Sequence, residues 1–354
     1  MLGLRSRKSG LAIAAASLVV AVAMAGSAPA VAQDGDLTVV PAVPKDFVPA
    51  KTPWGEPDLR GGWPIDHLNG RTPLERDPTY GNRAFLNEEE YAAKVSQVEA
   101  LEQRFENEDS EGKMGIGHWA EMGGPSRRTS FIIAPANGRL PERTATGQKL
   151  TSEMRSTWRR GQPFDSPADF DSWDRCITRG LPASMFPFMY NNGIRIFQSP
   201  GLVAMQLEMV HETRLIYTDG RDPIPSPIAN WMGDSRGSWD GPNTLVIETT
   251  NFQPGPSATN IGTTGSPPFN DTPVSNRAKM TERLTMTGQD EIIYEVTWND
   301  PEIFTAPWTA RLEWKRDDSY DMFEYACHEG NVQVRNYITA SRVERGLQEA
   351  QTGE

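Results

Sequence analysis

Two polar residues interrupt otherwise apolar strand faces, and their types could support acid–base chemistry. Every second residue is apolar over 203–209 until His211 follows in the same pattern, and Glu282 sits in a row of Met, Leu and Met over 280–286. Burying either side chain without a partner would cost roughly several kcal/mol or neutralise it. A buried glutamate beside a histidine can exchange protons with a substrate, so we predict His211 and Glu282 as a catalytic pair. The structural alternative places Glu282 against an arginine and His211 at a strand end.

Three loops are dense in polar and aromatic residues and supply the other candidate site residues. His328, in the stretch 324–331 beside a cysteine, is a third candidate acid or base. Aromatic rings combined with charged groups are typical of loops that stack on a ring and bind its hydroxyls. A tryptophan in a tight turn is as often a packing anchor, and an Asp-Gly pair often marks only a hairpin. The expected ligand-binding residues in these loops are Arg214, Arg221, Trp231, Asp234, Arg236 and Trp239. Tyr190 is added from the Met-rich segment 185–192, which is either an apolar wall of the pocket or part of the core.

Signatures of nucleotide and zinc chemistry are missing from the sequence. It contains no Walker loop, no GxGxxG after an expected strand and no HExxH. Glu208 and His211 have the spacing ExxH, but on a strand that spacing directs the two side chains to opposite faces. We therefore expect no cofactor and no metal. The candidate residues favour acid–base hydrolysis, elimination or isomerisation of a small polyhydroxy or aromatic compound.

Length and charge limit the class of protein. The chain has 354 residues, a formal net charge of −12, 28 Pro and 31 Gly. A chain of this length can bury a core, and its Pro and Gly content indicates long loops. The acidic balance argues against a nucleic-acid partner, because phosphate recognition needs a basic face. The expected partner is a small molecule, and the sequence predicts no oligomeric state.

The N-terminal residues predict export from the cell interior. Three positive residues precede an apolar run over 11–25, and an Ala-Val-Ala triplet ends at Ala32. This is the pattern of a secretory signal peptide, the alternative being an uncleaved membrane anchor, which the run is too short to form because a spanning helix needs about 20 residues. We expect cleavage near Ala32 and a periplasmic or extracellular mature chain without membrane insertion. In such an oxidising compartment Cys176 and Cys327 can form a disulfide, the alternative being two separate thiols.

The periodicity of the chain predicts a mainly β protein. Apolar and polar residues alternate over 291–298 and 308–315, as in strands with one buried face. Further expected strands cover 130–134, 194–198, 203–211, 213–218, 244–250, 279–287 and 320–327, and helices are expected over 87–107 and 144–160. About nine strands without alternating helices favour an antiparallel lipocalin-like barrel, or a two-sheet sandwich, with added helices.

The expected domain organisation has three parts. After the signal peptide at 1–32, a proline-rich coil arm covers 33–86, and a single β-rich domain covers 87–354. Within that domain the stretch 253–275 is rich in Pro and Gly and joins two expected strands. Loops longer than about 12–15 residues are usually functional or disordered, so this one is either a lid over a cavity or a disordered segment.

Several stretches resemble a widespread family of secreted bacterial proteins of unassigned activity. They read WMGDSRGSWDGPNTLVIETTNF at 231–252, TRLIYTDGR at 213–221, EYACHEGN at 324–331 and TPWGEPDLRGGW at 52–63. The resemblance implies a shared fold and a secreted location, and it implies no reaction. One departure is visible, because a run of the type HVVERF is expected where this chain has NRAKMTERL at 276–284. The acid of that run is present here and the histidine is not.

Two functions of different class fit these residues. In the first, a secreted β-barrel enzyme uses His211 and Glu282 for proton transfer, arginines to neutralise developing negative charge, and Trp231 and Trp239 to hold a ring. In the second, a non-catalytic periplasmic binding or accessory protein uses the same cavity without chemistry.

Overall fold

The computed structural model describes residues 35–70, 72–113, 115, 120–155, 157, 161–255 and 272–346. The chain divides into two compact units, Met1–Asp36 and Leu37–Glu354, and all helices and strands described here belong to the second. The expected signal peptide at 1–32 lies outside the described residues, and so does 256–271, most of the expected lid.

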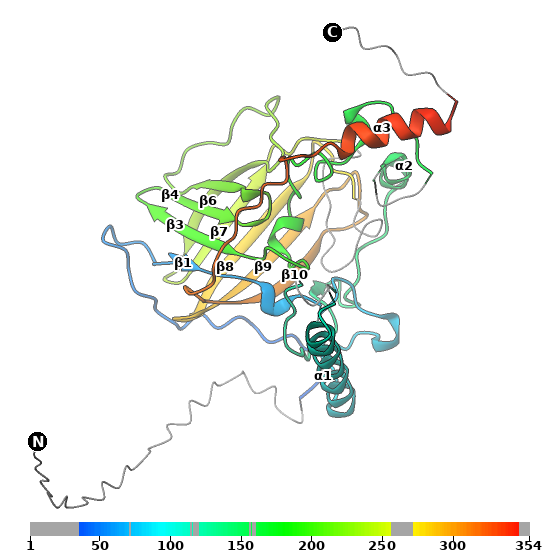
Figure 1. Ribbon diagram of the computed structural model, residues 1–354. Coiled ribbons are helices and arrows are strands. Elements are labelled where there is room, and N and C mark those ends of the chain that lie inside the picture. Colours follow the sequence, from blue (N-terminus) through cyan, green and yellow to red (C-terminus); the bar gives the residue numbers. More distant parts are fainter. Residues whose placement is uncertain are drawn as a thin grey trace, which may run out of the picture. The chain divides into compact units, whose positions relative to one another are not determined.

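Ten strands form one mixed sheet that curls into a half-barrel (Figure 1). The spatial order is β1-β3-β4-β5-β6-β7-β8-β9-β10-β2. The strands are β1 Gly61–Gly62, β2 Ile132–Ala134, β3 Ile194–Ser199, β4 Leu202–Leu207, β5 Thr213–Tyr217, β6 Asp234–Asp240, β7 Thr244–Thr250, β8 Lys279–Gly288, β9 Glu291–Asn299 and β10 Trp308–Lys315. The prediction of a mainly β protein is confirmed, whereas a closed barrel is not observed: β1 and β2 form the two edges of the described sheet.

One pair of neighbouring strands runs parallel, so the expectation of a purely antiparallel sheet is wrong at this position. Ile216 of β5 lies opposite Ser235 of β6, and Tyr217 lies opposite Arg236. Parallel neighbours cannot be joined by a tight hairpin, so residues 218–233 form a crossover between these strands. The other strand pairs of the described sheet are antiparallel.

The core lies on the inner face of the curled sheet, where the alternation predicted for 291–298 and 308–315 is confirmed. Trp298 of β9 lies opposite Trp308 of β10, and both are at most 1% exposed. The ring of Tyr294 stacks on that of Trp314, with the centroids 4.6 Å apart. Burying large aromatic rings contributes strongly to stability, so this face anchors the fold.

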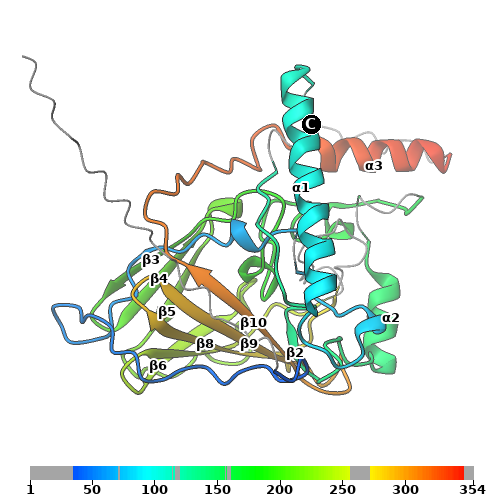
Figure 2. The ribbon, with the colours of Figure 1, turned by 90° about the horizontal axis from the view of Figure 1, so that it is seen from below.

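Three helices lie to one side of the sheet in both views (Figures 1 and 2). They are α1 Glu88–Ser110, α2 Ala145–Glu153 and α3 Gln333–Glu344. The start predicted for α1 is confirmed: Asn87 Oδ1 accepts a hydrogen bond from the Glu90 N–H, and the Glu90 carboxylate accepts one from the Asn87 N–H. This reciprocal cap satisfies two backbone donors at the helix start. The second expected helix ends at Glu153, and α3 was not expected.

The expected strand at 320–327 is wrong, because this segment contains no strand. It follows β10 as an irregular segment, which we call the strap, and one backbone N–H and one hydroxyl of the strap bind to a buried side chain. The buried carboxylate of Glu208 accepts hydrogen bonds from the Phe323 N–H at 2.8 Å and the Tyr320 hydroxyl at 2.9 Å.

Candidate functional site

Arg214 on β5 and Glu282 on β8 form a fully buried ion pair inside the sheet. The guanidinium donates from Nη1 to Glu282 Oε1 at 2.9 Å and from Nη2 to Oε2 at 2.6 Å, and both side chains are at most 1% exposed. The Tyr294 hydroxyl donates to Oε1 at 2.8 Å. Burial alone would lower the pKa of Arg214, but the carboxylate of Glu282 raises it. Glu282 therefore has the arginine partner of the structural alternative.

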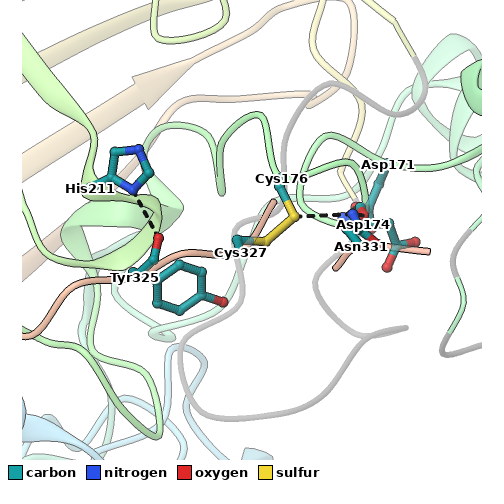
Figure 3. The surroundings of a disulfide bond; sticks show 7 residues. All are labelled: Asp171, Asp174, Cys176, His211, Tyr325, Cys327 and Asn331. Carbon is teal, nitrogen blue, oxygen red and sulfur yellow. Dashed lines mark hydrogen bonds between the residues drawn. A yellow bond between two sulfur atoms is a disulfide. The ribbon is translucent and has the colours of Figure 1, made fainter. Parts of the chain in front are cut away.

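His211 lies outside the strand that was expected to carry it. β4 ends at Leu207, and Val210 and His211 adopt left-handed backbone angles, with φ of 60° and 43°. This turn ends the alternation, so the prediction that His211 occupies an inward-facing position of a strand is wrong. Its side chain is exposed, and Nδ1 lies 2.9 Å from the carbonyl oxygen of Tyr325 (Figure 3). The structure thus gives His211 and Glu282 different partners and different surroundings.

The structure does bring His211 together with two other predicted site residues. The rings of His211 and His328 meet edge to face, with centroids 5.9 Å apart. The ring of Tyr325 stacks on that of Tyr190 at 6.4 Å, and burial raises the pKa of Tyr190 to about 12. We call His211, His328, Tyr325 and Tyr190 the histidine cluster. All four belong to segments whose positions are set by turns and by the strap.

Two charged residues beside the histidine cluster were missed by the sequence analysis. Burial raises the pKa of Glu212 to about 7, and its Oε2 accepts a hydrogen bond from Thr178 at 2.7 Å. Burial also lowers the pKa of Arg179 to about 9, and this guanidinium lies over the ring of Phe188, with Cζ 4.7 Å from the centroid. A carboxyl group that titrates near neutral pH can act as an acid or a base. For Glu212, the only signal in the sequence was its position next to the predicted catalytic residue His211.

The shifted pKa of Glu212 predicts a pH dependence of stability. Its pKa is 4.5 ordinarily and about 7 in the fold, so between these values the folded chain binds more protons than the unfolded chain. Stability therefore falls as pH rises through this window, by up to about 3 kcal/mol. We expect Glu212→Gln to match the wild type at pH 4 and to exceed it at pH 8, measured by urea unfolding across pH.

The variant Glu248→Gln is a suitable control, because Glu248 is exposed and pairs with Lys279 on the surface. The difference in free energy of unfolding between Glu248→Gln and the wild type should be the same at all pH values. If this difference is also independent of pH for Glu212→Gln, Glu212 does not titrate near pH 7 in the folded chain.

A pocket of about 480 Å³ opens at the parallel junction of β5 and β6, and we call it the crossover pocket. Four predicted ligand-binding residues line it: Arg214, Arg221, Asp234 and Arg236. The pocket also includes Thr213, next to Glu212, and Met232. The Thr178 hydroxyl lies 3.1 Å from Met232 Sδ and donates to Glu212, so one side chain links the pocket wall to that carboxyl group.

The polar side chains of the crossover pocket surround one tyrosine ring. The Cζ atoms of Arg221 and Arg236 lie 4.0 Å and 5.3 Å from the ring centroid of Tyr217. Arg221 pairs with Asp219 at 2.6 Å, and Arg236 pairs with Asp234 at 2.7 Å. Each positive charge thus has an adjacent carboxylate, so the pocket presents many donors and acceptors with little net charge.

One side chain binds three backbone carbonyl groups of the crossover. The amide nitrogen of Asn251, at the end of β7, donates to the carbonyl oxygens of Ile224, Pro225 and Ile228 at 3.0–3.2 Å. Asn251 has φ of 57°, a left-handed conformation that asparagine tolerates better than most residues. The backbone carbonyl oxygen of Asn251 also accepts a hydrogen bond from the Asn230 N–H at 2.9 Å.

The two tryptophans predicted to hold a ligand ring occupy packing positions. Trp231 and Trp239 are partly buried and pack against the main hydrophobic core. The guanidinium of Arg175 lies over the Trp231 ring, with Cζ 5.3 Å from the centroid. The aromatic residue that lines the crossover pocket is Tyr217, which the sequence analysis did not single out.

Residues 233–237 read Gly-Asp-Ser-Arg-Gly, the G-x-S-x-G spacing of a nucleophile elbow, which the expectation of pure acid–base chemistry overlooks. Such an elbow requires a serine on a sharp turn from strand to helix. Ser235 instead lies within β6, is 5% exposed and shares a hydrogen bond with Thr249 at 2.9 Å. The motif therefore forms part of a strand here, and Ser235 is not placed as a nucleophile.

The predicted disulfide is confirmed. Cys176 and Cys327 are joined with their Cα atoms 5.6 Å apart, across a sequence separation of 151 residues.

Among the described residues, no helix is long and apolar enough to cross a membrane. The same residues contain no group of three or more His, Cys, Asp or Glu that could hold a metal ion. The described ends of the expected lid meet in a bridge between Gly255 and Val274.

Comparison of the sequence with protein-family models and with curated proteins finds no match. The resemblance to secreted bacterial proteins of unassigned activity stays a prediction.

Proposed function

We propose that this protein binds a small polyhydroxy or aromatic compound in the crossover pocket. The observation that carries the proposal is the pocket of about 480 Å³ that gathers Arg221, Asp234 and Arg236 around the Tyr217 ring. Sites for small ligands usually have volumes of about 300–1,000 Å³ and a few convergent polar groups. The residues come from both ends of one crossover, next to the parallel pair of β5 and β6.

The charge pattern of the pocket supports a neutral ligand over a strongly charged one. Each guanidinium is already neutralised by a neighbouring carboxylate, Arg221 by Asp219 and Arg236 by Asp234. A guanidinium has five N–H donors, more than one carboxylate accepts, and carboxylates accept from hydroxyl groups. Sugar-like hydroxyls or a phenol match such alternating donors and acceptors.

A thermal-shift screen of monosaccharides, polyols and phenolic acids tests this proposal. A compound at 100 times its dissociation constant stabilises the fold by about 2.7 kcal/mol and raises Tm. We expect Arg236→Ala to weaken binding of such a compound roughly tenfold or more, as loss of a hydrogen bond to a charged group does. Arg283→Ala, which removes a surface ion pair with Asp240, should leave the affinity unchanged.

Two results would contradict the proposed site. One is a stabilising compound whose affinity is the same for the wild type and Arg236→Ala. The other is a compound whose bound position, determined in a crystal of the complex, lies away from Tyr217.

A second candidate function is acid–base catalysis at Glu212 and the histidine cluster, and the pKa of about 7 for Glu212 favours it. A compound from the screen should then be converted by the wild type, with the products followed by NMR. Glu212→Gln should abolish conversion while the thermal shift remains. Binding without conversion in the wild type would leave the non-catalytic function as the conclusion.

We also propose that the mature chain is exported. Disulfides persist mainly in oxidising compartments, and the bond between Cys176 and Cys327 supports such a location. Expression of the full chain in a bacterium with cell fractionation tests this. The protein should be recovered outside the cytoplasm with an N-terminus near Gln33, and an intact N-terminus in the cytoplasm would contradict it.

A further inference from the structure

The disulfide lies in the wall of a second pocket, of about 250 Å³, which we call the disulfide pocket. Besides Cys176 and Cys327, its lining includes Asp174, Asn331, Gln333 and Tyr337. Both cysteines are partly buried, not fully buried. A space of this size admits a small thiol to the sulfur atoms, whereas a structural disulfide inside a core is shielded from thiols.

One sulfur atom has a hydrogen-bond donor directed at it. The amide nitrogen of Asn331 lies 3.2 Å from Cys176 Sγ and 3.2 Å from the carbonyl oxygen of Asp174 (Figure 3). A donor at this position stabilises negative charge on Cys176 when the bond breaks. The sulfur that departs most readily in thiol–disulfide exchange is the one with the more stable thiolate, so Asn331 makes Cys176 the leaving group.

A carboxyl group in the same pocket adds to this arrangement. Burial raises the pKa of Asp174, whose carboxylate oxygens accept hydrogen bonds from the Thr157 N–H at 3.1 Å and hydroxyl at 2.7 Å. A carboxyl group with a raised pKa keeps its proton to higher pH and repels a nearby thiolate less than an ionised carboxylate would.

We propose that the bond between Cys176 and Cys327 is a thiol-exchange site for small thiols, with attack at Cys327 and departure of Cys176. A thiolate bonds to Cys327 Sγ as the S–S bond breaks. The electron pair of the broken bond leaves with Cys176 Sγ, which takes a proton. A second thiol then attacks the mixed disulfide and releases Cys327. Overall, two thiols become one disulfide, and the two cysteines are reduced.

Exchange at this site would act on the histidine cluster. Tyr325 precedes Cys327 by two residues, its carbonyl pairs with His211, and its ring stacks on that of Tyr190. Figure 3 shows the disulfide between this tyrosine and Asn331. Breaking the bond removes the covalent hold on the strap next to these contacts, so reduction should loosen His211 and Tyr190 from their present positions.

Reduction kinetics of the native oxidised protein test the proposal, with dithiothreitol as the probe and alkylation to count thiols. The rate should rise in proportion to dithiothreitol concentration and lie within about tenfold of the rate in urea, because the bond need not wait for unfolding. Asn331→Ala should slow native reduction about tenfold, the effect of losing one hydrogen bond to a charged group. Gln333→Ala, in the same pocket wall, is the matched control and should leave the rate unchanged.

A second measurement locates the attack. Brief exposure to glutathione, followed by alkylation and peptide mapping, should place the glutathione adduct on Cys327 and the alkyl group on Cys176. The proposal is overturned if the reduction rate levels off at the rate of global unfolding, if the adduct forms on Cys176, or if Asn331→Ala reduces as fast as the wild type. Measuring the wild type and the two variants in urea, where all three should react equally, separates the role of Asn331 from an effect on the unfolded chain.

Discussion

Replacing Glu282 with glutamine is expected to lower the free energy of unfolding by about 3–5 kcal/mol, the usual cost of leaving one partner of a buried ion pair alone. The variant would leave the cation of Arg214 at 1% exposure without its counter-charge. It would also weaken the contact made by the Tyr294 hydroxyl, which donates to Glu282 at 2.8 Å. Urea unfolding at pH 7 measures the change.

The exposed pair of Glu248 on β7 and Lys279 on β8 provides the control. Its side chains are 56% and 43% exposed, and such surface pairs contribute about 0–1 kcal/mol. Glu248→Gln should therefore change stability little. The double variant Arg214→Met with Glu282→Leu should recover most of the stability, because well-packed apolar residues often replace a buried ion pair without loss. A loss below about 1 kcal/mol for Glu282→Gln would show that Arg214 finds another partner or water.

Removing the disulfide by Cys176→Ser with Cys327→Ser should cost about 5 kcal/mol, since the closed loop has about 150 residues. The effect arises mainly in the unfolded chain, which regains the conformations that the cross-link forbids. The sequence separation of 151 residues places this bond among the longer loops. Comparing urea unfolding of the oxidised wild type and the double serine variant measures the difference. A loss under about 2 kcal/mol would mean that other contacts hold the ends of the loop together in the unfolded chain.

The strands were predictable where burial alone determined the pattern. In β9 and β10, aromatic and aliphatic residues alternate with polar ones because one face is buried, so the period of two was visible in the sequence. The direction of a neighbouring strand leaves no such trace, and the parallel pairing of β5 with β6 was missed for that reason. The strand expected at 320–327 had a suitable alternation, but there the Phe323 N–H and the Tyr320 hydroxyl donate to the carboxylate of Glu208, and no strand forms.

The site was predictable in part for similar reasons. Arg221, Asp234 and Arg236 are near one another in sequence, and the crossover brings them to one pocket. The pairing of His211 with Glu282 assumed that a strand continues through Val210, whose left-handed backbone could not be inferred from residue type. Glu212 became notable only once its burial was known, because an isolated glutamate in a sequence carries no sign of a raised pKa.

The clamp formed by Asn251 has a consequence for how this protein could change over evolution. One amide, placed at the end of β7, holds three carbonyl groups of the crossover without using the side chains of those residues. The identities of residues at 224–229 are therefore free to vary while the loop keeps its path. Within this segment Ile224 lines the crossover pocket, so ligand preference could change through this position, with the sheet and its buried ion pair kept constant beneath it.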